Sequence, residues 1–308
     1  MNRIQFGPLY FPTEEGPGAI ELAERAEEWG YDYYWVPDYV TLPYMDAFVL
    51  LGAVAQRTSS LRLGTAVVLA PFRTPFQFAK ASASVDLLSQ GRFTLGVGIG
   101  AVPRDFEIAQ VDLRQRGRIS DETLDIIRKL FSQESVSYKG RYYTFDNFTI
   151  GPTPIQSQIP IWIGAQGGDS FPEGVIRRAG LYGDGFFPVD TSVEQFQKAQ
   201  VRIKEVATSH GRDPEAIQWG LLTWLCAGPS KEEARETASR EISKRLGQDR
   251  YLEGERGYAL GTPKDMIETI ESYVEIGLTN FVIDPGCAPR DILAHVEVFA
   301  KEVIPHFR

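Results

Sequence analysis

The chain has 308 residues, of which 43% are hydrophobic and 24% are charged, a composition typical of a globular protein with an extensive core. Its 41 acidic and 32 basic residues give a formal net charge of −9, which argues against a nucleic-acid-binding protein because such proteins need a broad basic surface. We expect a cytoplasmic protein with no membrane or metal partner, because no apolar run approaches the roughly 18 residues of a membrane span and the two cysteines lack metal-ligand spacing.

The first half of the chain alternates short apolar strands with amphipathic helices. A strand at 4–7 precedes a helix at 18–29, whose apolar residues recur on one face and which Gly30 ends. The same unit then recurs. The predicted strands span 33–36, 61–68 and 93–97, and the helices that follow them span 46–57, 76–88 and 119–131. Residues 138–159 break this alternation with aromatics and turn-forming glycine and proline, so we expect an insertion with a small hairpin there.

The second half of the chain resumes the alternation. The predicted strands span 161–163, 185–187, 218–226 and 279–283, and the predicted helices span 174–179, 193–209, a stretch from Lys231, 263–276 and 291–303. Thr262 suits the N-cap of the helix at 263–276, and a second irregular stretch, 247–261, precedes that helix. Eight strands with helices between them predict an α/β fold, a single (β/α)₈ TIM barrel over residues 1–308 with insertions after strands four and seven.

Two glycine-rich segments follow predicted strands, at the end of the barrel where such enzymes bind ligands. The first is Gly96-Val97-Gly98-Ile99-Gly100, which lacks the third glycine and the helix of a dinucleotide fingerprint. Its small residues either only let the chain turn at the rim or leave room for a flat ring against the backbone. The second is Gly164-Ala165-Gln166-Gly167-Gly168-Asp169-Ser170, which is either a flexible loop or a cradle of backbone N–H groups for a phosphate.

Asp38 and Tyr39 stand directly after the second predicted strand. A tyrosine at this rim could donate a proton or bind a ring carbonyl, whereas the simpler alternative is a capped turn before Pro43. The three histidines lie elsewhere, within or after helices or in the C-terminal tail; they are His210, His295 and His306. We therefore do not expect metal-dependent hydrolysis or a histidine triad.

Taken together, these segments resemble the luciferase-like monooxygenase superfamily of flavin- and deazaflavin-dependent barrel enzymes. The resemblance covers nearly the whole chain and is strongest around the third and fourth strands. The matching residues there are Leu63-Gly64-Thr65 through Pro75, Ala79-Lys80, Asp86-Leu87-Leu88-Ser89-Gln90-Gly91-Arg92-Phe93 and Gly96-Val97-Gly98-Ile99-Gly100. Further matches are Phe106, Arg116-Gly117-Arg118, Asp121-Glu122, Pro160-Ile161-Trp162-Ile163-Gly164, Arg178-Ala179, Gly183-Asp184-Gly185 and Gly261-Thr262-Pro263.

The resemblance implies a flavin or deazaflavin at the C-terminal rim of the strands. It places the ring near Asp38 and the third strand, where relatives carry a cis peptide between two non-proline residues; by position this is Ala66–Val67. It places the cofactor phosphate at Gln166-Gly167-Gly168. The cofactor-binding residues expected on this basis are Asp38, Thr65, Ala66, Val67, Val68, Val97, Gly98, Ile99, Gly100, Ala165, Gln166, Gly167 and Gly168.

Two departures from the sugar dehydrogenases of this superfamily concern proton transfer. Those enzymes carry a histidine after the aspartate and a glutamate after the glycines, whereas this chain has Tyr39 and Ala101. Their acid and base assignment therefore does not transfer, and we take Asp38 and Tyr39 as the catalytic candidates, with Tyr39 as the proton donor. Relatives that activate oxygen often use a histidine near the flavin, and none is suitably placed here. This favours hydride transfer with the deazaflavin coenzyme F-420 and a small organic substrate.

Other functions stay open on the sequence alone. An FMN-dependent two-component monooxygenase would use oxygen and a separate flavin reductase as its partner. A non-redox barrel lyase would hold a substrate phosphate on the glycine loop, and a non-catalytic flavin-binding protein would explain the missing histidine and glutamate. The aromatics of the loops at 39–44, 138–159 and 247–261 favour an apolar or aromatic-compatible substrate pocket. The resemblance also implies a homodimer.

Overall fold

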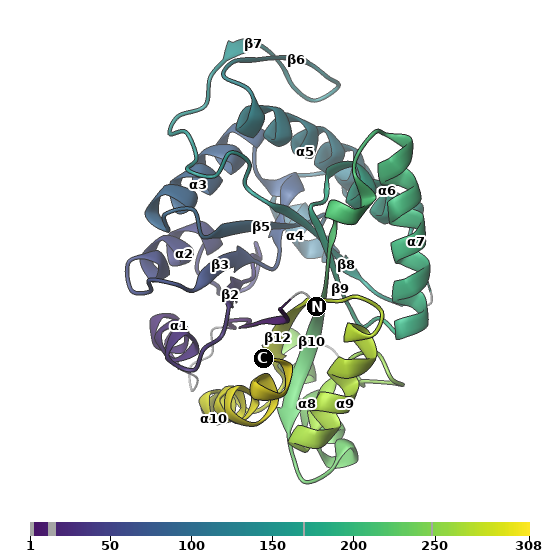
Figure 1. The fold of residues 1–308 in the computed structure, drawn as a ribbon. Helices are drawn as coiled ribbons and strands as arrows, with labels where there is room; N and C mark the ends of the chain where they lie inside the picture. Colours follow the sequence, from purple (N-terminus) through teal and green to yellow (C-terminus); the bar gives the residue numbers. More distant parts are fainter. Residues whose placement is uncertain (1–2, 12–16, 169, 248) are drawn as a thin grey trace.

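The computed structural model describes residues 3–11, 17–168, 170–247 and 249–308 and consists of a parallel barrel surrounded by helices (Figure 1). The barrel strands are β1 (Gln5–Pro8), β2 (Tyr33–Val36), β3 (Arg62–Thr65), β5 (Phe93–Gly98), β8 (Ile161–Gln166), β9 (Gly185–Val189), β10 (Gln218–Ala227) and β12 (Asn280–Pro285). Their order is β1-β12-β10-β9-β8-β5-β3-β2. The circle closes where Leu9 pairs with Trp35 and the Tyr10 N–H donates to the Trp35 carbonyl oxygen at 2.9 Å. The predicted TIM barrel is confirmed.

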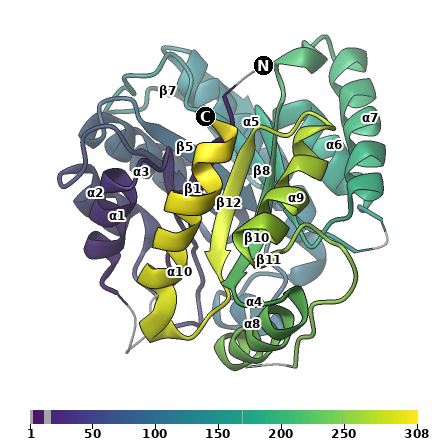
Figure 2. The ribbon, with the colours of Figure 1, turned by 60° about the horizontal axis from the view of Figure 1, so that its bottom comes forward.

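Helices cover the outside of the barrel in chain order, except the short helix at 103–108, which lies at the end of the barrel against the loops that carry Thr41 and Phe72 (Figure 2). They are α1 (Ala19–Glu28), α2 (Ala47–Ala55), α3 (Pro75–Leu88), α4 (Pro103–Ile108), α5 (Arg116–Ser132), α6 (Glu173–Tyr182), α7 (Val193–Ser209), α8 (Lys231–Leu246), α9 (Pro263–Val274) and α10 (Ile292–Val298). The predicted N-cap is confirmed, since the Thr262 side chain accepts a hydrogen bond from the Asp265 N–H at the start of α9. Among the described residues, no helix has both the length and the apolar character that a membrane span requires.

Both predicted insertions are present. In the first, β6 (Val136–Lys139) and β7 (Thr144–Phe148) form an antiparallel hairpin that stands at the top of the molecule in Figure 1. The second contains β11 (Ala259–Gly261), which pairs in parallel with β10. The sequence did not predict β11 or α4. The single strand predicted at 61–68 is divided in the structure into β3 and β4 (Val68–Leu69), and β4 pairs with β5 beyond the end of β3.

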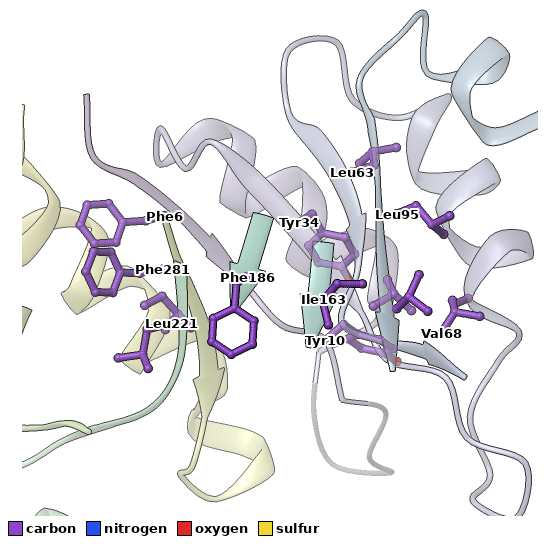
Figure 3. Packing of buried hydrophobic residues seen from close by; sticks show 14 of the residues in the cluster. Phe6, Tyr10, Tyr34, Leu63, Val68, Leu95, Ile163, Phe186, Leu221 and Phe281 are labelled. Atoms are coloured by element: carbon purple, nitrogen blue, oxygen red, sulfur yellow. The ribbon is translucent and has the colours of Figure 1, made fainter. Parts of the chain in front are cut away.

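Alternate residues of each strand point outward and form a continuous apolar layer beneath the helices. Figure 3 shows part of this layer, to which each strand contributes large side chains such as Phe6 of β1, Phe186 of β9 and Phe281 of β12. The Phe6 and Phe281 rings are stacked with centroids 5.6 Å apart. This packing fixes the strands that carry the site.

The remaining residues point inward, where two tryptophans fill the barrel below its mouth. Trp35 and Trp162 are buried, with ring centroids 6.1 Å apart. A Cβ added to Gly64 would lie 2.2 Å from the Trp35 ring, and one added to Gly185 would lie 2.3 Å from the Trp162 ring. Glycines on neighbouring strands therefore make room for the indoles, and these indoles close the barrel from below.

Candidate functional site

The chain leaves the regular sheet between β3 and β4. The peptide bond between Ala66 and Val67 is cis, at the position implied by the family resemblance. The Val67 side chain lies between two glycines: a Cβ added to Gly98 of β5 or to Gly164 of β8 would come within 2.5 Å of a Val67 methyl carbon. Glycine is therefore required at both positions if Val67 is to keep this place.

Ala66, Val67, Gly98 and Gly164 form a surface of small side chains at the C-terminal end of the barrel, which we call the floor. Ala66 is buried and Val67 half-buried, and both pack with Trp35 and Phe187 in the apolar cluster inside the barrel. Beside them Ile99 and Gly100 are half-buried, and Gly100 has a φ of +75°. Val67 has the largest side chain on this floor, so a flat apolar ring could approach the floor closely.

Three of the predicted cofactor-binding side chains do not line this floor. Val68 and Val97 are buried in the outward-facing layer beneath the helices. The Thr65 hydroxyl donates to the Gly96 carbonyl oxygen at 2.8 Å and accepts the Gly96 N–H at 2.9 Å. The alternation of a strand turns these three side chains away from the barrel interior, so a cofactor could meet these residues only through their backbone. Thr65 instead joins β3 to β5 behind the floor.

The predicted phosphate cradle after β8 is only partly available. The Gly167 N–H donates to the Val189 carbonyl oxygen at 2.8 Å, and the Gln166 side-chain amide donates to Asp190 at 2.7 Å. Ala165 pairs with Pro188 of β9. A Cβ added to Gly168 would meet no atom within 4 Å, so open space remains at that residue. Asp169, also part of the predicted loop, lies outside the described residues.

Asp38 follows β2 and belongs to a triad of charges. Its carboxylate lies 3.3 Å from a guanidinium nitrogen of Arg73, and the same nitrogen lies 2.7 Å from Asp46. Burial raises the pKa of Asp38, and Arg73 offsets this only in part. Asp46 also accepts the backbone N–H groups of Phe48 and Val49 as the N-cap of α2. Two carboxylates thus share one guanidinium.

Tyr39 lies in the mouth of the barrel, against the inner apolar cluster. Its ring packs edge-on against that of Tyr44, with centroids 5.4 Å apart. Burial raises the pKa of the Tyr39 hydroxyl; Asp284 and Asp105 add to the rise, while Arg245 opposes it. The hydroxyl therefore keeps its proton at neutral pH and can donate a hydrogen bond.

A buried ion pair, carried by β12 and α8, lies near Tyr39. Arg245, in the last turn of α8, lies 2.9 Å from the carboxylate of Asp284 on β12. Its guanidinium is held between two rings, 3.9 Å from the centroid of Phe11 and 4.9 Å from that of Trp224. Burial raises the pKa of Asp284 to about 6, although Arg245 lowers it in part.

A second arginine–aspartate pair lies next to the first. Asp190, after β9, accepts a hydrogen bond from the Trp224 indole N–H at 3.1 Å and pairs with Arg250. Because the Arg250 guanidinium also lies 5.9 Å from the Trp224 ring, this indole is held from several sides. The wall formed by β9, β10 and β12 is therefore fixed by paired charges.

Sequence reasoning missed Arg73, Asp190, Arg245, Arg250 and Asp284. Asp190 and Asp284 could have been found, because each stands at the C-terminal end of a predicted strand as Asp38 does. The arginines gave no such signal, since each reaches the mouth from a helix end or a loop that is distant in sequence from its partner.

Two cavities open at this end of the barrel. The larger, of about 590 Å³, is lined by Asp38, Tyr39, Val40, Tyr44, Met45, Asp46, Phe72, Arg73, Gln77 and Ala81. The smaller, of about 190 Å³, is lined by Gln166, Asp190, Arg250, Tyr251, Glu253, Arg256 and Tyr258. The catalytic candidates therefore line the larger cavity, and the residues beside the predicted phosphate loop line the smaller one.

Residues 12–261 match the family described as luciferase-like monooxygenase. An F420-dependent glucose-6-phosphate dehydrogenase of Amycolatopsis mediterranei is 29% identical, with 99% of this chain and 96% of the relative aligned. A 4-hydroxyprotoasukamycin monooxygenase of Streptomyces nodosus subsp. asukaensis is 31% identical, with 76% of this chain and 67% of the relative aligned.

Solved structures agree with the fold. An F420-dependent secondary alcohol dehydrogenase in complex with an F420-acetone adduct superposes with a TM-score of 0.82 at 23% identity, covering 99% of each chain. The coenzyme F420 dependent tetrahydromethanopterin reductase from Methanopyrus kandleri superposes with a TM-score of 0.79 at 20% identity, covering 99% of this chain and 100% of that one. At these identities the likeness concerns the architecture.

Proposed function

The chain belongs to the luciferase-like monooxygenase family of oxidoreductases, and from this premise we propose that it transfers hydride between the deazaflavin coenzyme F-420 and a small organic substrate. The observation that carries the proposal is the floor of the barrel mouth, where Val67 fits between Gly98 and Gly164. The relative with an F420-dependent activity aligns with 99% of this chain, which supports the choice of cofactor.

The residues at the mouth fit a planar cofactor. Ala66, Gly98 and Gly164 offer it a surface without projecting polar groups, and Asp38 and Tyr39 offer polar contacts at its edge. Its phosphate has open space at Gly168 and a guanidinium, that of Arg250, in the smaller cavity beside Gln166. We therefore retain Asp38, Ala66, Val67, Gly98, Ile99, Gly100 and Gly168 as proposed contacts and add Arg250.

Tyr39 is the proposed proton donor. A bound deazaflavin would supply a hydride donor or acceptor. The Tyr39 hydroxyl, whose pKa is raised by burial, stays protonated and can give its proton to a substrate oxygen that gains negative charge. The paired charges Arg245–Asp284 lie near Tyr39, and the Arg245 guanidinium packs on the Trp224 ring. The two tryptophans below the floor exclude water from beneath.

A second candidate is an FMN-dependent two-component monooxygenase with a separate reductase. The relative named as a 4-hydroxyprotoasukamycin monooxygenase, at 31% identity, favours it. The two candidates differ in whether oxygen is consumed when reduced cofactor and substrate are present.

One experiment separates them. The purified chain is given reduced coenzyme F-420 or reduced FMN with a panel of ketones and aldehydes, and oxygen uptake is followed alongside oxidation of the cofactor. We expect anaerobic, substrate-dependent oxidation of coenzyme F-420, slowed about 100-fold or more in Tyr39→Phe because the proton donor is lost. Oxygen-dependent product with FMN alone would favour the monooxygenase, and no turnover with either cofactor would refute both.

A further inference from the structure

The larger cavity has the size of a ligand site and lies against the proposed catalytic residues. Its volume of about 590 Å³ is within the range of small-molecule pockets, about 300–1,000 Å³. It lies between the segment 38–46, which follows β2, and the segment 72–81, which leads into α3. A molecule bound there would reach the carboxylate of Asp38 and the ring of Tyr39.

The charges that line this cavity do not cancel. They are two carboxylates, Asp38 and Asp46, and one guanidinium, Arg73. Arg73 approaches Asp46 to 2.7 Å and Asp38 only to 3.3 Å, and Asp46 receives two further hydrogen bonds as the N-cap of α2. Besides Arg73, Asp38 receives a backbone hydrogen bond from Leu69. The cavity thus carries a net negative charge, with Asp38 as the less neutralised carboxylate.

A further acidic residue, Asp105, fixes the segment that lines this cavity. Asp105 of α4 is 1% exposed, and one of its oxygens accepts the Thr41 N–H at 3.1 Å and the Thr41 hydroxyl at 2.5 Å. Its other oxygen is buried and has no hydrogen-bond partner within the described part of the chain. Asp105 therefore holds the segment that carries Tyr39.

The remaining walls of the cavity are largely apolar. Phe72 and Tyr44 contribute rings, and Val40 and Met45 are 41% and 50% exposed although they are large hydrophobic residues. Apolar side chains around a buried, incompletely neutralised carboxylate suit a ligand with an apolar body and a hydrogen-bond-donating or cationic head.

We propose that this cavity is the substrate site and that it selects molecules with an apolar body and a cationic amine or neutral hydroxyl head, while excluding phosphorylated and carboxylated substrates. The head lies at Asp38 and the body along Tyr44, Met45 and Phe72. This inference rests on the oxidoreductase function proposed above for its catalytic meaning, whereas the charge selection belongs to the cavity itself.

The test compares three probes of nearly the same shape on the purified chain without cofactor: benzylamine, benzyl alcohol and benzoate. Binding is followed by ligand-observed NMR and by calorimetry at low salt. We expect benzylamine to bind at least about tenfold more tightly than benzoate, with benzyl alcohol between them. Benzoate binding as tightly as benzylamine, or no binding of any of the three, would overturn the proposal.

Two substitutions test whether the preference among the three probes arises in this cavity. Asp38→Asn should abolish the preference for benzylamine over benzyl alcohol. Met45→Lys places a positive charge on an exposed lining residue and should shift the preference toward benzoate without requiring any change in the core. The control is Glu253→Gln, which removes a charge from the smaller cavity and should leave all three affinities unchanged. An unchanged order of affinities in both Asp38→Asn and Met45→Lys contradicts the assignment.

The probe experiment and the cofactor experiments can fail independently of each other. If the chain binds coenzyme F-420 but shows no preference among the probes, the substrate class is wrong and the proposed function stands. If the probes rank as expected while neither cofactor binds, the cavity is a selective site and the proposed oxidoreductase chemistry is wrong.

Discussion

Val67 determines the shape of the proposed cofactor site at the residue scale. Its two methyl groups occupy the space that side chains at Gly98 and Gly164 would fill. A glycine on an interior strand weakens it unless a close approach requires the missing side chain, and here that close approach is visible. The site therefore depends on three residues that are far apart in the sequence.

Gly98→Ala tests this dependence. The added methyl group would displace Val67 into the barrel mouth, so we expect cofactor affinity to fall at least about tenfold, measured by fluorescence titration, with the fold retained. Adding Val67→Ala to this variant should restore part of the affinity because the space is freed again. Gly174→Ala on α6, where an added Cβ would only touch Arg178 at 3.7 Å, is the control. Unchanged affinity in Gly98→Ala would show that the floor is not the cofactor site.

Asp284 makes a pH-dependent contribution to stability. Burial raises its pKa to about 6, with Arg245 and Arg250 offsetting part of the rise, whereas an unfolded aspartate titrates near about 4. Between these values the folded state binds more protons than the unfolded state. This group therefore makes the fold less stable as the pH rises from about 4 to about 6.

Asp284→Asn should remove this dependence of stability on pH. From about pH 4 to about pH 6 the wild type should lose stability relative to this variant, by up to about 1.4 kcal/mol per pH unit in urea unfolding. The control is Asp46→Asn: burial opposes ionisation of Asp46, but hydrogen bonds from Arg73 and the backbone outweigh it and lower its pKa. The stabilisation by Asp46, which this variant lacks, should therefore be lost in the wild type only below about pH 4. A constant stability difference between the wild type and Asp284→Asn would refute the assignment.

At the scale of elements, the carboxylate of Glu122 binds the turn of the first insertion to the helices around the barrel. Glu122 of α5 accepts the backbone N–H groups of Arg141 at 3.0 Å, Tyr142 at 3.0 Å and Tyr143 at 2.8 Å, in the turn between β6 and β7. The Phe76 ring packs against the hairpin as well, 4.9 Å from the centroid of Phe145. The Tyr142 hydroxyl also donates to the Gln115 side chain at 2.8 Å, so the hairpin is held by several contacts.

Glu122→Ala should release the turn without opening the barrel. Three backbone N–H groups lose their acceptor, so we expect hydrogen exchange at 141–143 to become about 10–100 times faster, while the amides of β5 are unaffected. Glu122→Gln, which keeps an acceptor oxygen, should show a smaller change. Equal protection in the wild type and Glu122→Ala would mean that the other contacts of the hairpin hold the turn without this carboxylate.

The sequence predicted the barrel strands and their helices but not the short elements at the rim, and the difference has a physical reason. Barrel strands and their helices follow from local apolar periodicity, and the predicted helix at 193–209 matches α7 at both ends. The six-residue α4 and the short strand β11 were missed because their existence depends on partners that are distant in sequence. For the same reason Arg245 and Arg250 were missed from the site, and the outward direction of Val68 and Val97 became clear only from the alternation along the folded strands.

At the scale of the whole molecule, the barrel is built around two indoles. Trp35 and Trp162 fill its interior, and glycines on neighbouring strands leave the space for them. The mouth is thereby closed from below, and the proposed chemistry is confined to the C-terminal rim.

Gly64→Ala tests this packing. The added Cβ would lie 2.2 Å from the Trp35 ring, deep in the barrel, so the indole must move. We expect a loss of about 1–3 kcal/mol in the free energy of unfolding, measured by urea denaturation. A second substitution, Trp35→Phe, should recover part of it. Full stability of Gly64→Ala would contradict this account of the barrel interior.

The central claim is that the barrel mouth holds a flavin-type cofactor, and a binding titration of the purified chain with coenzyme F-420 and with FMN tests it most directly. We predict saturable binding of coenzyme F-420, stronger than that of FMN and weakened by Gly98→Ala, followed by quenching of cofactor fluorescence. Stronger binding of FMN would favour the monooxygenase, and failure of both cofactors to bind the folded protein would contradict the claim.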